Sequence, residues 1–196
     1  GIHTDFANQD KIKDLALYET MNGKPGELIS LQDYIAAMPE SQKDIYFILA
    51  ESRTAAENSP ALEIFRRLGY DVLFMTDPID EWIMQSMLQY DKHHFKPAAK
   101  GELALEGDEK EKLAKEVADA DEKYANLLEF ITGALTGKVS KVRFSGRLTD
   151  SVSCLVSEEG AMSPHMERMF KAMNQELPPS ERILELNPNH PLIAAM

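Results

Sequence analysis

Histidine and cysteine side chains, the usual metal ligands and nucleophiles, are few and scattered along this sequence. His93 and His94 are adjacent, so on a strand they point to opposite faces and cannot share a metal ion. Asp91 could join one of them, although a solvated turn explains the three residues as well. Cys154 has no histidine or aspartate at a catalytic spacing and lies on an apolar strand face, which is typical of a small core side chain. We therefore predict no catalytic residue and no metal site.

Two apolar stretches, residues 44–49 and 71–76, are typical of buried strands. The segment between them predicts a helix, so the three elements form a right-handed βαβ unit. Such units often bind nucleotides, but the turn at 50–56 has no glycine for close approach to a diphosphate, and the chain has no Walker-type Gly-Lys-Ser/Thr. We predict no cofactor site. A small-molecule enzyme that uses the crevice near Ala50 and Thr76 is the alternative interpretation.

Four of the ten methionines lie within twelve residues and follow a helical spacing of four, three and four. This stripe, which Phe170 widens, predicts an amphipathic helix over residues 163–174 and comprises Met162, Met166, Met169 and Met173. A helix that faces the core is one explanation. A surface that adapts to many partners is the second, because methionine is flexible and polarisable. A copper site that combines the thioethers with His165 is the third.

The elements expected in the first hundred residues form a small α/β/α subdomain with a short parallel sheet. Apolar spacing predicts helices over residues 8–18, 30–38 and 59–68, the last with Ser59 as its cap and Pro60 at its first position. The two strands named above and a short strand near Phe95 supply the sheet. An apolar helix that follows Asp77 carries Trp82, the only tryptophan.

The second half predicts an α+β domain with a long heptad helix and a three-stranded sheet. Residues 101–108 have the composition of a linker, and Asp108 is the expected cap of the helix. Apolar residues recur at heptad spacing from Leu113 to Ala134, so we expect one long helix that packs lengthwise on a partner surface. The strands are predicted at 139–145, 151–156 and 182–187.

The composition excludes several classes of partner. The formal net charge is −12 and each half of the chain is acidic, so we expect neither nucleic acid nor an anionic membrane as a partner. The longest strongly apolar run, residues 45–50, is far too short to cross a bilayer. A single cysteine suits a reducing compartment. Because the chain opens on Gly1 and residues 191–196 look like the first turns of a helix without a stop signal, we expect a fragment.

Several short motifs occur in the order found in the heat-shock protein 90 chaperones, and together they cover nearly the whole chain. The motifs that resemble the middle domain of this family are Asp33-Tyr34, Met38-Pro39-Glu40, Gln42 to Tyr46, Glu51-Ser52, Ser59-Pro60 and Asp77 to Trp82. Those that resemble its C-terminal domain are Arg147-Leu148-Thr149-Asp150, the methionine-rich segment, and Glu185-Leu186-Asn187-Pro188. The compact linker is similar to that of bacterial members.

The resemblance implies that residues 1–100 are the C-terminal α/β/α part of the middle domain. It implies that residues 101–196 are the client-binding and dimerisation domain, truncated before the final dimer helices. ATP and Mg would bind an absent N-terminal domain, so we expect no cofactor in this fragment and no enzyme activity of its own. The full-length protein would be a cytoplasmic, homodimeric ATPase that assists protein folding under stress.

The resemblance also implies where unfolded client proteins bind. In this family clients contact the helix that carries the tryptophan and the amphipathic methionine helix, and the matching positions here are Trp82, Gln85, Met162, Met166, Met169 and Phe170. A purely structural module, with the methionine stripe buried against the helix at 113–134, is a further possibility. The solvent exposure of Met166 and Met169 distinguishes these two functions.

Overall fold

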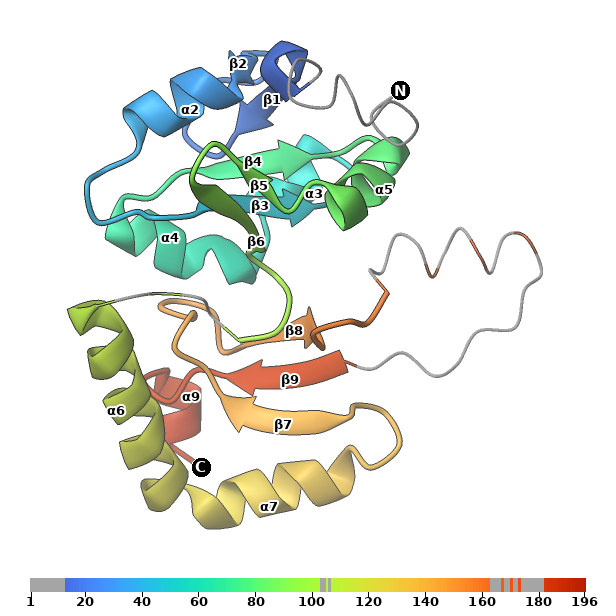
Figure 1. The fold of residues 1–196 in the computed structure, drawn as a ribbon. Coiled ribbons are helices and arrows are strands. Elements are labelled where there is room, and N and C mark those ends of the chain that lie inside the picture. Colours follow the sequence, from blue (N-terminus) through green and yellow to red (C-terminus); the bar gives the residue numbers. More distant parts are fainter. Residues whose placement is uncertain are drawn as a thin grey trace. The chain divides into compact units, whose positions relative to one another are not determined.

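The computed structural model describes residues 13–102, 105, 107–162, 167, 170, 173 and 182–196, and the chain divides into two compact units. The first unit comprises Gly1–Ser59 and Phe65–Ala98, and the second comprises Pro60–Ile64 and Ala99–Met196. Each unit combines helices with one sheet (Figure 1). The predicted mixed α/β class is therefore confirmed.

The first unit is built on a six-stranded sheet with the order β2-β1-β4-β3-β6-β5. Its strands are β1 (Leu17–Thr20), β2 (Ile29–Ser30), β3 (Ile45–Leu49), β4 (Val72–Met75), β5 (Gln89–Tyr90) and β6 (His93–Pro97). The central strand β3 pairs in parallel with β4 and with β6, while the outer pairs are antiparallel. The short parallel sheet that the sequence predicts is thus the centre of a larger mixed sheet.

Strand β1 corrects only the end of the helix predicted over residues 8–18: residues 13–15 are helical, residues 17 and 18 belong to the strand, and residues 8–12 lie outside the described part. Tyr18 and Thr20 are buried and alternate with the more exposed Leu17 and Glu19. This period of two is that of a strand with one buried face. The antiparallel ladder with β4, in which Thr20 lies opposite Leu73, outweighs the helical spacing of the preceding residues.

Helices cover both faces of this sheet. They are α2 (Leu31–Ala37), α3 (Arg53–Glu57), α4 (Glu63–Leu68), which follows a 3-10 turn (Pro60–Leu62), and α5 (Pro78–Ser86). Ile45 and Phe47 of β3 share a core with side chains of α2 and α5. The alternate residue Tyr46 points to the other face, where its ring lies 4.6 Å from that of Phe65 in α4. None of the described helices is long and apolar enough to span a membrane.

The second unit contains the three-stranded sheet that the sequence predicts. Its strands are β7 (Lys141–Phe144), β8 (Ser153–Ser157) and β9 (Arg182–Leu186), in the order β7-β9-β8. The central strand β9 is parallel to β7 and antiparallel to β8. A short helix, α9 (Pro191–Ala194), follows and buries Ile193 in the same core as Phe144 and Leu186.

The single long helix predicted over residues 108–134 is not confirmed, because two helices, α6 (Asp108–Lys123) and α7 (Ala125–Ala134), meet at Tyr124. A continuous helix of that length would extend for about 40 Å, whereas strands of four or five residues span about 17 Å. The bend keeps Val117 and Leu127 packed on the sheet, and the Tyr124 ring lies 5.7 Å from that of Phe144. The predicted cap is also wrong, since α6 begins after Gly107 without a side-chain cap.

Candidate functional site

The start of α5 is fixed by its own sequence. The Asp77 carboxylate accepts a hydrogen bond from the backbone N–H of Ile79 at 3.0 Å, and Asp80 accepts one from the backbone N–H of Asp77 at 3.0 Å. Pro78 occupies the first turn, where its missing N–H costs nothing. This reciprocal cap sets the rotation of the helix and therefore decides which side chains face the solvent.

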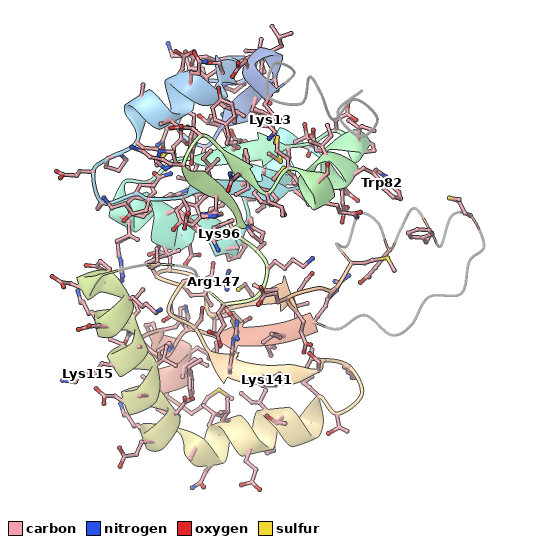
Figure 2. All side chains as sticks on the ribbon, in the orientation of Figure 1. Lys13, Trp82, Lys96, Lys115, Lys141 and Arg147 are labelled. Atoms are coloured by element: carbon pink, nitrogen blue, oxygen red, sulfur yellow. The ribbon has the colours of Figure 1, made fainter. Side chains whose placement is uncertain are left out.

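The two faces of α5 differ in exposure. Ile83, Met84 and Met87 pack against the core of the six-stranded sheet. Trp82 is 40% exposed and Ile79 is 50% exposed, and Figure 2 shows the Trp82 side chain projecting from α5 away from that sheet. Ile79 and Trp82 therefore lie on the exposed side of a helix that is capped at its start and packed on its other side.

Two exposed apolar residues were missed in the analysis of the sequence. Ile79 precedes Trp82 by three residues, which places both on one helical face. Leu88, just after the helix, is 69% exposed. The predicted Gln85 is exposed as well and adds a polar group beside them. Helical spacing alone would have found Ile79.

The titratable groups around α5 serve the fold. Burial raises the pKa of Asp80, and the nearby charge of Asp77 raises it further, against a backbone hydrogen bond from Asp77 that lowers it. Burial also raises the pKa of Tyr18 to about 12, with a further contribution from Asp80. Tyr18 therefore stays neutral near physiological pH. The exposed face of α5 offers apolar contact rather than proton transfer.

The predicted methionine stripe is described only in part. Met162 and Met173 are exposed, and Phe170 is partly buried. Met166, Met169 and His165 lie outside the described residues. The helix over residues 163–174, the client-binding role of its stripe and the copper site therefore stay predictions.

The other residues with chemical potential are held by the fold. The Nδ1 atom of His93 is 2.6 Å from the backbone oxygen of Lys43, while His94 is exposed, so the two imidazoles point apart as predicted. Burial raises the pKa of the Cys154 thiol to about 12, and the charge of Glu185 adds to the effect. In the described ranges, no three His, Cys, Asp or Glu side chains gather closely enough to hold a metal ion.

The strand ends near Ala50 and Thr76 do not present an open phosphate site. The Ser52 hydroxyl accepts a hydrogen bond from the backbone N–H of Ala55 at 3.2 Å and so caps α3. Asp77 caps α5 in the same manner. A phosphate bound at a helix N-terminus needs these N–H groups, and here side chains of the chain itself use them.

The family follows from a match along the entire sequence: the family model described as Hsp90 protein matches residues 1–196. This chain belongs to the Hsp90 family. It is 47% identical over 198 aligned positions to the chaperone protein HtpG of Geobacter metallireducens and, equally, to that of Geobacter sulfurreducens. Each alignment covers 100% of this chain, which spans 30% of the length of these curated relatives.

One solved structure overlaps the chain in part. It is the middle domain of a heat shock protein of Plasmodium falciparum, with 36% sequence identity and a TM-score of 0.48. The match covers 50% of this chain and 41% of the other.

The Hsp90 motifs found in the sequence contact one another in the structure. In the first unit, the Tyr34 hydroxyl donates to the backbone oxygen of Asp71 at 2.6 Å and accepts from Gln42 at 2.9 Å. In the second unit, Arg147 and Glu185 form a buried ion pair. These residues form contacts within the two units, whereas Trp82, in the same set of motifs, is exposed.

Proposed function

We propose that this chain is the client-binding part of an Hsp90-type molecular chaperone. The observation that carries the proposal is the exposed apolar face of α5, formed by Ile79 and Trp82, with a further exposed apolar side chain, Leu88, just after the helix. Family membership and the identity to HtpG chaperones support it. Exposed large apolar side chains that lie together on a rigid element are typical of interaction surfaces.

The physical properties of this surface suit unfolded partners. Burial of each such side chain stabilises a complex by about 1.5–3 kcal/mol, less the cost of ordering the partner. A few of them together support weak binding that does not depend on one partner sequence. The exposed Met162 and Met173 are flexible and would adapt to different clients. We therefore propose that Trp82, Gln85, Met162, Met166, Met169 and Phe170 contact clients, with Ile79 and Leu88 added from the structure.

The same proposal covers the domain boundaries, the cofactor, the oligomeric state and the location of the whole protein. The first unit corresponds to the end of the middle domain and the second to the beginning of the C-terminal domain. In the whole protein, ATP and Mg would bind outside this chain, two protomers would form a dimer, and the location would be cytoplasmic. This part would have no enzyme activity of its own and no nucleic-acid or membrane partner.

Two alternative functions have less support. The enzyme that would use the crevice near Ala50 and Thr76 is supported neither by the relatives nor by the capped helices found there. If the chain were a purely structural module, the methionine stripe would be buried against the helix at 113–134. The apolar residues of α6 and α7 pack instead against the three-stranded sheet, where Val142, Phe144 and Leu186 receive them.

Substitution of Trp82, the only tryptophan, tests the proposal directly. Reduced, carboxymethylated α-lactalbumin labelled with fluorescein serves as the unfolded client, and its fluorescence anisotropy reports binding. We expect Trp82→Ser and Ile79→Ser each to weaken binding several-fold without changing the melting temperature. The control is Phe130→Ser, which removes a still more exposed aromatic side chain from α7 and should leave binding unchanged.

The methionines need their own variant. Met166→Ser combined with Met169→Ser should weaken client binding and leave the melting temperature almost unchanged if the stripe is a client surface. A loss of several kcal/mol in stability would instead place both side chains in a core. Client binding that survives all of these substitutions would contradict the proposal.

A further inference from the structure

A groove in the second unit runs between α6 and the strand β7. Its volume is about 390 Å³, which is within the range of small-molecule sites. Leu113 and Val117 of α6 and Phe144 of β7 supply an apolar wall. Ala114 and Ala118 also line it, and their small side chains leave it open. None of the proposed client-binding residues lines this groove, so the site goes beyond the chaperone function.

Charged side chains form the polar part of the groove lining. Arg143 Nη2 lies 2.6 Å from one oxygen of Glu185, and Arg147 Nε lies 2.7 Å from the other. Two guanidinium groups thus share one carboxylate. Lys110, Glu102 and Asp121 also line the groove, so its lining combines three cationic with three anionic side chains, and an anion would be held by a local contact with Arg143 rather than by a net positive charge.

One nitrogen of the Arg143 guanidinium group can donate a further hydrogen bond. Its Nε binds Glu185, and its Nη2 binds both Glu185 and the backbone oxygen of Gly101. Its Nη1 has no hydrogen-bond partner among the described residues. This atom is not fully buried, so it is open to solvent. Guanidinium N–H groups form short, strong hydrogen bonds to carboxylates.

We propose that this groove binds a small amphipathic carboxylate. The hydrocarbon part would lie against Leu113, Val117 and Phe144, and the carboxylate would accept a hydrogen bond from Nη1 of Arg143. Glu102 and Asp121 also line the groove. Their negative charges disfavour ligands with several negative charges, such as phosphate esters, and so favour a monoanion.

Octanoate and 1-octanol, a neutral compound with the same chain length, test the charge requirement. Each is titrated into the 196-residue chain, and backbone amide shifts of Ala114 and Val117 are followed by NMR. Octanoate should bind about tenfold more tightly than octanol, or better, because only the carboxylate gains a charge-assisted hydrogen bond. Equal affinities, or no shift with either compound, would overturn the proposal.

Two variants test the position. Ala118→Trp places a large ring in the groove from α6, which supplies none of the ion-cluster residues, and should abolish octanoate binding. The matched control, Lys115→Trp, changes a residue that projects from α6 away from the sheet (Figure 2) and should bind octanoate as the parent does. Arg143→Lys should reduce octanoate affinity towards that of octanol and leave octanol binding unchanged. Octanoate binding that persists in Ala118→Trp would place the ligand elsewhere and refute the assignment.

Discussion

The Nε atom of Arg147 lies 2.7 Å from Oε2 of Glu185, and both residues are at most 2% exposed. The same carboxylate oxygen accepts a hydrogen bond from the Ser145 hydroxyl at 2.6 Å. Arg147 also donates to the backbone oxygen of Gly101 at 2.7 Å. This ion pair therefore joins the segment before α6, the turn after β7 and the central strand β9.

Replacement of Arg147 by methionine should destabilise the second unit strongly. Removing one partner of a buried ion pair leaves the other charge buried, which costs about 3–5 kcal/mol. Urea unfolding followed by circular dichroism measures the loss. The control is Lys141→Met, a cation on the same sheet that is exposed and should change stability by less than about 1 kcal/mol. Similar losses of stability in both variants would mean that the buried ion pair stabilises the fold no more than an exposed lysine does.

Local signals in the sequence were reliable predictors. The apolar runs at β3 and β4 predicted buried strands, and the Ser30 hydroxyl accepts the backbone N–H of Asp33 at 3.1 Å, as the capping pattern indicates. Gly69 follows α4 with a φ of +69°, a conformation that glycine adopts without strain. In each case a few neighbouring residues determine the structure.

Features that depend on distant residues were not predictable. An arginine is normally exposed, and nothing near Arg147 indicates that Glu185 of β9 neutralises it. The break at Tyr124 depends on the length of the sheet beneath α6 and α7, which the heptad pattern does not encode. Trp82 was predicted as a site residue only through the resemblance to the Hsp90 family. Ile79 could have been predicted from helical spacing alone, because it precedes Trp82 by three residues.

Glu63 holds a turn that carries one of the Hsp90 motifs. Its carboxylate accepts hydrogen bonds from the backbone N–H groups of Thr149 at 2.6 Å, Asp150 at 2.9 Å and Ser151 at 3.1 Å. Burial alone would raise the pKa of Glu63, but the hydrogen bonds from these residues outweigh it and lower the pKa. Glu63→Ala removes the acceptor of three N–H groups and should cost about 1–3 kcal/mol.

The lowered pKa of Glu63 predicts the direction of a pH effect. The folded state holds the proton less tightly than the unfolded state, so stability rises with pH in the acid range. The contribution of Glu63 is complete above the ordinary glutamate pKa of about 4.3, and it is lost as the pH falls through the lower folded value. The stability difference between the parent and Glu63→Gln should therefore shrink on acidification. Glu129→Gln, at an exposed position on α7, is the control, and a constant difference for Glu63→Gln would contradict the prediction.

Tyr34 should lose stability when only its hydroxyl is removed. The hydroxyl donates to Asp71, accepts from Gln42, and also accepts the backbone N–H of Tyr46 at 3.3 Å. Tyr34→Phe leaves these buried groups short of partners, and we expect a loss of about 1–3 kcal/mol in the free energy of unfolding. In Tyr124→Phe the hydroxyl removed has no hydrogen-bond partner among the described residues, so that variant should match the parent. Equal stability of both variants would show that the Tyr34 contacts contribute little.

Cys154 should react with alkylating reagents only when the second unit unfolds. Burial first, and then the charge of Glu185, raise the pKa of its thiol to about 12, and the sulfur lies 3.9 Å from Oε2 of Glu185. At about pH 8 the thiol is then almost entirely protonated, and the thiolate is the reactive form. Iodoacetamide labelling followed by mass spectrometry should be very slow in buffer and fast in concentrated urea. A single cysteine at the exposed position 140, made as Ser140→Cys with Cys154→Ser, should react rapidly in both conditions. Rapid labelling of Cys154 in the folded chain would mean that the ion cluster around Glu185 opens far more often than its burial indicates.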